Sequence, residues 1–305
     1  MRKYLMILFI AVSILTANSQ NVRTVHLDGQ PLEEALGDDI FNIDSLVVTG
    51  KIMKDDYKNG LSKALYLGRV RGVDLSGCET ENGKMYYLSA NKDGHPVHPE
   101  NLRYFRVHKN TEDIEQTFRF TTLCDFHLPA TLRTIGDRAF LRSTIVDDLW
   151  IPEGVDSIAP YAFFNAKMPN NVYLPASLRV MGTLAFSEDE KYIGDVNLWC
   201  QWTNVPDLED KLYGIGPFAE VFSRWTIHVP VGSKQSYLDN EYFREFEKIV
   251  EYDPAVLAGI QRAGVADKPS AAPLAIYTIS GQYVGTDFNS LPSGVYVMRG
   301  KKVVK

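Results

Sequence analysis

The chain has 305 residues, 45% of them hydrophobic and 23% charged, and its 32 basic and 38 acidic side chains leave a net charge of −6. This composition is typical of a folded protein, and the spread of aromatic and branched aliphatic residues excludes disorder throughout. The acidic balance argues against a general nucleic-acid binder, whose phosphate contacts need a basic surface, and against attachment to anionic lipid through a polybasic patch.

The N-terminal segment predicts export. Arg2 and Lys3 precede an apolar run over residues 5–15, and Ala17 and Ser19 follow it. This order of charged, apolar and small residues is that of a secretory signal peptide, so we expect residues 1–19 to be removed. The alternative is a retained anchor, for which the run is short. No later segment of the sequence approaches transmembrane length, and we predict a secreted or outer cell-surface protein.

A repeat of 23 residues occupies the centre of the chain. Three copies align without a gap over residues 128–140, 151–163 and 174–186. Positions recurring at this interval are Pro129, Pro152 and Pro175; Ile135, Ile158 and Met181; and Phe140, Phe163 and Phe186. A fixed period in this range indicates a solenoid, and we expect the phenylalanines to fill its interior.

Each copy opens with an apolar alternation that predicts a strand. The L-x-x-L-x-L pattern extends the array in both directions and marks nine candidate strands. Their apolar positions are Ile43/Leu46/Val48, Val70/Val73/Leu75, Leu102/Phe105/Val107, Leu123/Phe126/Leu128, Val146/Leu149/Ile151, Val172/Leu174, Ile193/Val196/Leu198, Ile227/Val229 and Phe246/Ile249. Because alternation with period 2 places successive side chains on opposite faces, we expect parallel strands with their apolar residues inside the coil.

These motifs resemble the BspA-like leucine-rich repeat family of bacterial surface and secreted proteins. The unit L-P-x-x-L-x-x-I-G-x-x-A-F carries the resemblance in the central copies, and Val70, Val73, Leu75 and Cys78 follow the general leucine-rich repeat pattern. The resemblance implies a repeat solenoid over residues 20–252. We predict a right-handed leucine-rich-repeat parallel β-sheet with mostly non-helical returns, which serves adhesion or protein–protein interaction through its concave sheet.

Two insertions interrupt the array and a small module follows it. Leu75 and Val107, like Phe186 and Phe218, are 32 residues apart where the period is 23. Residues 253–272 indicate a linker, and residues 273–305 alternate as a C-terminal β-hairpin module. This module is similar to the C-terminal sorting domain of type IX secretion cargo. The alternative is a module that only packs on the array.

The sequence contains no recognisable motif for catalysis or metal binding. His95 and His98 lie in a proline-rich loop without acidic partners at ligand spacing, so we expect no metal site. Neither a complete phosphate loop nor a G-x-S-x-G elbow is found. Cys78, Cys124 and Cys200 permit at most one intrachain disulfide, and we interpret them as small buried hydrophobes. We therefore predict no cofactor and no enzyme activity.

The repeat allows the exposed face of the sheet to be written as two rows of side chains. The residue between the two apolar positions of each strand is expected to point outward. This row is Val47, Asp74, Arg106, His127, Trp150, Tyr173, Asn197 and His228, and the neighbouring row is Tyr104, Asp125, Asp148, Asn171 and Asp195. Exposed aromatics among polar groups are typical of recognition surfaces. The alternative is that the aromatic pair only stabilises the sheet.

The predicted binding residues are Arg106, Asp125, His127, Asp148, Trp150, Tyr173, Asp195, Asn197 and His228. The family resemblance implies an extracellular or host protein as the partner, and the carboxylates favour a basic or hydrogen-bond-donating surface on it. Two alternatives stay open. One is a glycan-binding module with Trp150 and Tyr173 as its stacking platform, and the other is an enzyme whose site lies in the insert around Trp199 and Tyr213.

Overall fold

The computed structural model describes residues 21–66, 68–88, 90–92, 95–97, 102, 104–124, 126–188, 194–208, 215–257, 276–278, 283–285, 295–298 and 301–304. The predicted signal peptide, most of the predicted linker, and the residues His98, Asp125 and Tyr213 lie outside these ranges. The chain divides into two compact units, Met1–Tyr252 and Asp253–Lys305.

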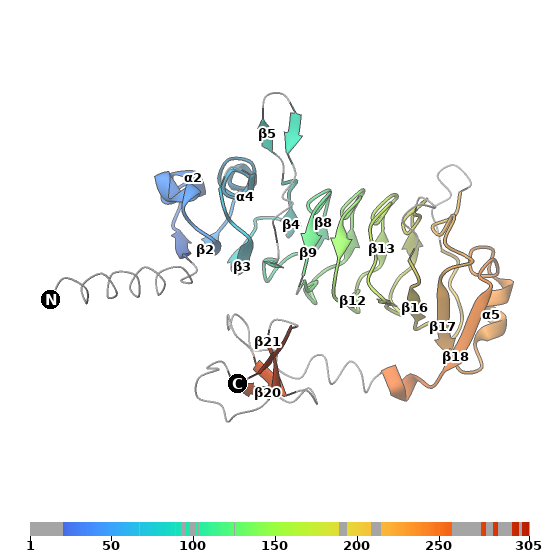
Figure 1. Ribbon diagram of the computed structural model, residues 1–305. Helices are drawn as coiled ribbons and strands as arrows, with labels where there is room; N and C mark the ends of the chain where they lie inside the picture. The colour runs from blue at the N-terminus through green and yellow to red at the C-terminus, as the bar shows by residue number, and fades with distance from the viewer. Residues whose placement is uncertain are drawn as a thin grey trace. The chain divides into compact units, whose positions relative to one another are not determined.

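The first unit is a solenoid of parallel strands that follow one another along its axis (Figure 1). Its main sheet begins with the order β1-β2-β3-β7, formed by Val22–Leu27, Ser45–Lys51, Gly72–Glu79 and Tyr104–Arg106. A separate group of paired strands follows along the coils in the order β12-β14-β16-β17-β18, and we call the two groups together the main sheet. The strands of the second group are Leu149–Trp150, Asn171–Leu174, Asn197–Cys200, Thr226–Pro230 and Lys248–Tyr252. The predicted parallel solenoid is confirmed, and β1 adds a strand that the repeat pattern does not predict.

One predicted strand of the main sheet is much shorter than expected. Around Phe126 the pairing is reduced to an isolated parallel bridge between Arg106 and His127. The neighbouring pair β9 (Thr122–Leu123) and β11 (Thr144–Ile145) belongs to a separate two-stranded sheet. The prediction of a strand here is therefore wrong in extent, although His127 still follows Arg106 in the stack.

The return segments form a second ladder. Its order is β15-β13-β10-β8-β4, formed by Val180–Met181, Ser157–Ile158, Thr134–Ile135, Asp113–Ile114 and Lys84–Met85. Thr134 pairs with Ser157 and Ser157 pairs with Val180, so each pairing advances by one repeat of 23 residues. The returns stack closely, because a Cβ atom on Gly182 would overlap the backbone nitrogen of Pro160.

The repeat phenylalanines form a continuous stack inside the solenoid, which we call the inner phenylalanine stack: Phe118, Phe140, Phe163, Phe186 and Phe218. Consecutive ring centroids are 5.3, 4.9, 4.9 and 5.7 Å apart, and all five side chains are fully buried. The last step joins the residues on either side of the second insertion. The predicted alignment across that insertion is thus confirmed, since the extra residues leave the stack unbroken.

The returns at the N-terminal end are helical, which the prediction of mostly non-helical returns did not include. Between β1 and β3 lie α2 (Leu32–Leu36), the 3-10 helix η1 (Gly37–Phe41), α3 (Lys54–Asp56), the π-helical turn η2 (Tyr57–Leu61) and α4 (Ser62–Tyr66). Buried leucines spaced by four favour helices in these returns. Leu32 and Leu36 lie on one face of α2, and Leu61 and Leu65 lie on one face of the helical segment η2–α4. The buried Asp56 carboxylate links these returns by accepting the Leu32 N–H at 2.7 Å and the Met53 N–H at 2.8 Å.

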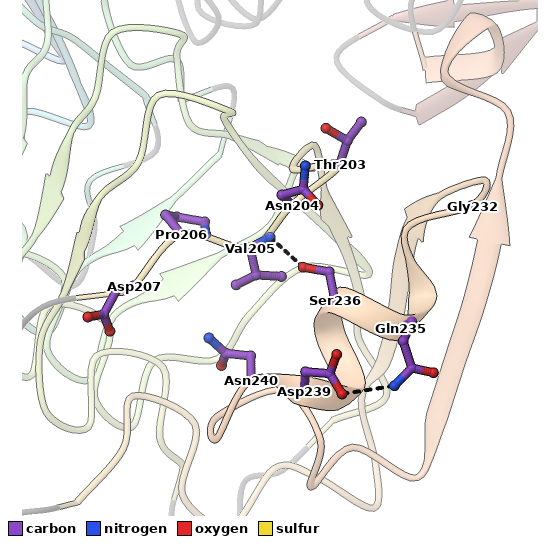
Figure 2. Close-up of a pocket in the computed structure, with 10 residues that line it drawn as sticks. All are labelled: Thr203, Asn204, Val205, Pro206, Asp207, Gly232, Gln235, Ser236, Asp239 and Asn240. Carbon is purple, nitrogen blue, oxygen red and sulfur yellow. Dashed lines mark hydrogen bonds between the residues drawn. The ribbon is translucent and has the colours of Figure 1, made fainter.

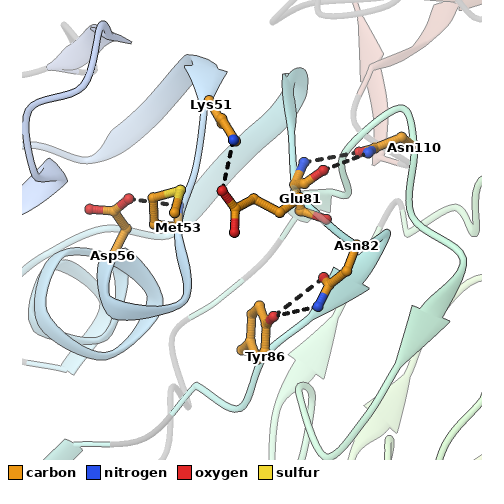
Figure 3. Close-up of polar contacts among 8 residues, drawn as sticks. Lys51, Met53, Asp56, Glu81, Asn82, Tyr86 and Asn110 are labelled. Carbon is orange, nitrogen blue, oxygen red and sulfur yellow. Dashed lines mark hydrogen bonds and ion pairs between the residues drawn. The ribbon is translucent and has the colours of Figure 1, made fainter.

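Polar contacts hold the first insertion against the coil beside it (Figure 3). The Asn110 side chain accepts the backbone N–H of Thr80 at 3.1 Å and donates to its carbonyl at 2.9 Å. Lys51 and Glu81 form an ion pair at 2.8 Å. Beyond this anchor, β5 (Ala90–Lys92) and β6 (His95–Val97) pair as an antiparallel hairpin. The predicted insertion is therefore an added hairpin that leaves the coils before and after it in register.

The second unit is a small antiparallel sheet. Its order is β20-β19-β21-β22, formed by Tyr283–Gly285, Ile276–Thr278, Val295–Met298 and Lys301–Val304. Met298 lies opposite Lys301, as the predicted hairpin requires. The alternation from residue 274 to residue 284 predicts a single strand, but these residues contribute to two, β19 and β20.

Candidate functional site

Four ring side chains stack along the outer face of the main sheet, and we call them the outer ring row: Trp150, Tyr173, Trp199 and His228. Strand register places them opposite one another on β12, β14, β16 and β17. The ring centroids are 3.5, 5.9 and 4.1 Å apart, with interplanar angles of 7°, 19° and 12°. The rings thus lie nearly parallel, and each covers a face of its neighbour.

A polar rim runs beside the outer ring row on the same strands. Asn171 donates from Nδ2 to the exposed Asp148 carboxylate at 3.1 and 3.2 Å, and its Oδ1 accepts the Trp199 indole N–H at 3.2 Å. Asn197 Oδ1 lies 3.0 Å from His228 Nε2. These bonds fix the ring orientations, so the surface is ordered before any partner arrives.

The structure corrects the predicted row by two residues on β16. Trp199, and not Asn197, lies opposite Tyr173, while Asn197 lies opposite Asn171 and takes the place predicted for Asp195. Val196, Leu198 and Cys200 are all buried, so the alternation is satisfied equally well by either register. A shift of two residues keeps every side chain on its own face, and only the partner strands decide between the alternatives.

Tyr173 is buried, which contradicts its prediction as an exposed contact residue. Its side chain retains only 3% exposure, because Trp150 and Trp199 cover its two faces. Burial and the nearby Asp148 carboxylate raise the pKa of Tyr173 to about 12, so the hydroxyl stays protonated at neutral pH. Trp150, Trp199 and His228 remain half-buried and are the rings that a partner can reach.

The other predicted residues are less closely associated with the row. Arg106 and His127 are joined by a backbone bridge, and the Arg106 guanidinium lies 5.9 Å from the centre of the Tyr104 ring. Asp195 is exposed and forms an ion pair with Arg224 at 3.1 Å. Asp74 lies in its predicted place in the row, because strand register pairs it with Val47 and with Arg106, but it is not exposed. Its carboxylate accepts the Ser76 N–H and O–H at 2.8 and 2.6 Å.

A polar hollow of about 590 Å³ lies between the loop after β16 and helix α5 (Lys234–Asp239), at the C-terminal end of the array (Figure 2). The Val205 N–H donates to Ser236 Oγ at 2.8 Å, and Gln235 Nε2 donates to Asp239 Oδ1 at 2.8 Å. Among the lining residues only Asp207 and Asp239 are titratable, and no histidine, lysine or cysteine is present to activate a nucleophile. The lining is therefore mainly amide, hydroxyl and carboxylate groups.

Metal clusters and membrane-spanning helices are absent from the part of the chain that the structure describes. They contain no group of three or more His, Cys, Asp or Glu side chains placed to hold a metal ion. No helix within the described ranges is long and apolar enough to cross a membrane. Cys78 and Cys200 are buried, which confirms the prediction for these two residues, and burial raises the pKa of the Cys78 thiol to about 12.

Comparison with known families agrees with this fold. Residues 98–208 match the model of the BspA type leucine rich repeat region, in six copies. No curated protein matches the chain. The match covers 111 of the 305 residues, and together with the parallel solenoid it supports a leucine-rich repeat fold for this part of the chain. Trp150, Tyr173 and Trp199 lie inside the matched region, and His228 lies in the strands that continue it.

Proposed function

We propose that this protein is an exported leucine-rich repeat binding protein that holds a protein partner, in adhesion or in another protein–protein interaction, through the outer ring row. The observation that carries the proposal is the preordered row of rings with its polar rim. Trp and Tyr side chains supply large contact areas at low entropic cost and dominate protein interfaces. The BspA-type repeat region supports a binding role of this kind.

The geometry favours a protein partner over a glycan. A sugar ring stacks on an open aromatic face, whereas both faces of Tyr173 and one face of Trp150 are covered by neighbouring rings. The outer ring row therefore offers ring edges and polar groups. Protein side chains and backbone groups can contact ring edges, for which edge-to-face geometry is favourable. The predicted stacking platform of Trp150 and Tyr173 is thus less well supported than the protein-binding surface.

The rim defines the chemistry of the partner. The Asp148 carboxylate is exposed, and within the described part of the chain its side-chain donor is the Asn171 amide, so it can accept further hydrogen bonds from Lys or Arg. Basic side chains next to apolar ones would match the carboxylate and the ring edges together. Because the carboxylate is exposed, association with such a partner is expected to weaken as salt is raised.

A binding screen against purified extracellular proteins tests this proposal. The chain is presented to the protein panel and to a glycan array, and each hit is repeated with Trp150→Ala/Trp199→Ala and with Phe41→Ala. Phe41 is a matched control because it is an exposed aromatic residue outside the row, at 50% exposure. We expect the double variant to weaken protein binding by about 30-fold, equivalent to about 2 kcal/mol, and Phe41→Ala to have little effect. A hit that is insensitive to the double variant, or hits confined to glycans, would contradict the proposal.

Export is the second part of the proposal and rests on the two chain ends. The charged, apolar and small-residue order of residues 1–19 supports signal-directed export, and the likeness of residues 273–305 to type IX sorting domains supports passage to the cell surface. Mass analysis of the exported protein is expected to place its first residue at Gln20. Deleting residues 273–305 is expected to retain the chain inside the cell envelope. Met1 in the exported material would reject the signal peptide, and unchanged surface delivery would reject the sorting role.

A further inference from the structure

A second surface lies on the corner of the coils where the returns turn back toward the main sheet. We call it the arginine corner and define it by Arg119, Phe120, Arg138, Arg142 and Tyr161. The guanidinium groups of Arg119 and Arg142 lie 5.6 and 5.9 Å from the centre of the same Phe120 ring. Arg138 lies 4.9 Å from the centre of the Tyr161 ring. Aromatic rings thus contact three cationic groups on two consecutive coils.

Two of these guanidinium groups have no carboxylate partner among the described residues. Arg119 donates to the Gln116 side-chain oxygen at 3.2 Å and also lies 5.6 Å from the Tyr87 ring centre. Arg142 is exposed, and the contact it makes in the described structure is with Phe120. Arg138, by contrast, pairs with Asp137. Two like charges beside one ring repel each other, so an anion placed between them would be stabilised.

The backbone at this corner has a left-handed conformation that recurs from coil to coil. Phe120, Arg142 and Asn165 occupy the same position in three successive coils, with φ of 56°, 54° and 54°. Asparagine adopts this left-handed conformation readily, whereas Phe and Arg do so at a cost in free energy. The two coils with the unfavourable residues are also the ones that supply the cations and the shared ring. Positive φ also recurs at Gln116, Arg138, Tyr161 and Leu184, so the left-handed backbone is a regular feature of these turns.

We propose that the arginine corner binds an acidic polypeptide segment of a partner protein, separately from the outer ring row. Guanidinium groups pair with carboxylates through two parallel hydrogen bonds, and Arg with aromatic residues is the side-chain composition of interface hot spots. A sulfated glycan is disfavoured as the occupant, because guanidinium groups already lie over the Phe120 ring where a sugar would stack. The chain as a whole has a net charge of −6, so the arginine corner is a local positive region on an acidic protein.

Fluorescence anisotropy with a labelled oligo-glutamate peptide at low ionic strength tests the proposal. The protein is the full mature chain, oligo-glutamine is the neutral probe and a heparin fragment is the sulfated one. We expect Arg119→Gln/Arg142→Gln to weaken oligo-glutamate binding by roughly tenfold. Arg133→Gln/Arg179→Gln is the matched control, since it removes the same charge from guanidinium groups that donate to nearby backbone carbonyls. This control is expected to change the affinity less than about twofold.

A third variant separates binding from folding. Arg142→Asn places a residue suited to the left-handed turn at this position, so the melting temperature is expected to stay level or rise while oligo-glutamate binding falls. Trp150→Ala should leave oligo-glutamate binding unchanged, which keeps this surface distinct from the outer ring row. Equal losses in the two double variants, no binding of oligo-glutamate by the wild type, or tighter binding of heparin than of oligo-glutamate would each overturn the proposal.

Discussion

Two stacks of rings run along the same solenoid, one inside it and one on its surface. The inner phenylalanine stack has no polar atoms and is fully buried, with ring centroids 4.9–5.7 Å apart. The outer ring row contains an indole, a phenol, a second indole and an imidazole, with Trp150, Trp199 and His228 partly exposed. Both stacks follow from the same parallel register. They differ in the interactions that are lost when one of their rings is replaced by alanine.

The difference indicates a division of labour between fold and binding. A buried Phe contributes the free energy of its transfer out of water and its close packing. Its truncation to Ala leaves a cavity between the coils. A ring at the surface contributes a smaller cross-strand interaction, but its polar atoms and edge remain available to a partner. We therefore expect stability to depend mainly on the inner phenylalanine stack and partner binding on the outer ring row.

The largest effect on stability is expected from Phe163→Ala. Phe163 lies 4.9 Å from both Phe140 and Phe186 by ring centroid and is fully buried. Its truncation should lower the free energy of unfolding in urea by about 3–5 kcal/mol, whereas Phe163→Leu, which keeps most of the volume, should cost about 1 kcal/mol. If Phe163→Ala cost less than Tyr173→Ala, the proposed division between the two stacks would be wrong.

A pH titration sharpens the comparison through two histidines. Buried His108 contacts Tyr57 and lies 3.0 Å from Thr111 Oγ1, and burial lowers its pKa to about 4. In the unfolded chain the His108 pKa is near 6.5, so between about pH 4 and pH 6.5 the unfolded chain binds more protons at this residue than the folded chain does. The His108 contribution to the free energy of unfolding should therefore fall by about 3 kcal/mol as the pH drops from about 6.5 to about 4. Glu188, whose pKa is raised to about 7 by burial, contributes with the opposite sign between about pH 7 and pH 4.5.

The control for this titration is His108→Gln, because the difference between its pH profile and that of the wild type gives the His108 contribution. Burial also lowers the pKa of His228, so this histidine contributes a slope of the same sign. Since it is only half-buried in the outer ring row, we expect His228→Gln to leave most of the pH dependence in place. Urea unfolding at several pH values measures both variants. An unchanged slope in His108→Gln would place the titrating group elsewhere.

Tyr173 is expected to be the member of the outer ring row that matters most for stability. Trp150 and Trp199 enclose its ring, so Tyr173→Ala should cost about 2 kcal/mol in unfolding free energy. Tyr173→Phe keeps the stack and should cost less than about 0.5 kcal/mol. Differential scanning calorimetry of the two variants distinguishes ring packing from the contribution of the hydroxyl. A large cost for Tyr173→Phe would assign the stability to a polar contact instead.

The smallest effect on stability is expected from Trp150→Ala. Trp150 is half-buried, and its closest ring neighbour in the described structure is Tyr173, at 3.5 Å. Removing the indole should lower the unfolding free energy by about 1 kcal/mol or less, because one cross-strand contact is lost and no internal cavity forms. Chemical denaturation beside Phe163→Ala gives the comparison directly. If Trp150→Ala lowered the unfolding free energy as much as Phe163→Ala does, the main role of the outer ring row would be to stabilise the fold.

The sequence predicts the fold well because the fold repeats. Proline and phenylalanine positions 23 residues apart are sufficient to infer the coils, and the inner phenylalanine stack follows from that period. The helical returns were not predicted because they precede the regular copies and follow their own leucine spacing. The bridge at His127 was not predicted because an apolar pattern does not reveal how many backbone pairs a strand will make.

The candidate site was predicted less completely, for reasons of register and shielding. Trp199 was assigned to an insert because Leu198 fits either of two apolar positions in an alternating strand. The burial of Tyr173 depends on both neighbouring rings, and one of them is the misplaced Trp199. The rim bonds of Asn171 and Asn197 depend on the same register. The shift of two residues on β16 therefore accounts for most of the difference between the predicted and the observed site.

The dissociation constant of a protein partner, measured in parallel for Trp150→Ala/Trp199→Ala and for Phe163→Leu, tests the central claim most directly. Both proteins are compared with the wild type at a temperature where circular dichroism shows that all three are folded. The account predicts a loss of about 30-fold for the surface variant and less than about twofold for the interior one. Equal affinities, or a greater loss for Phe163→Leu, would contradict it.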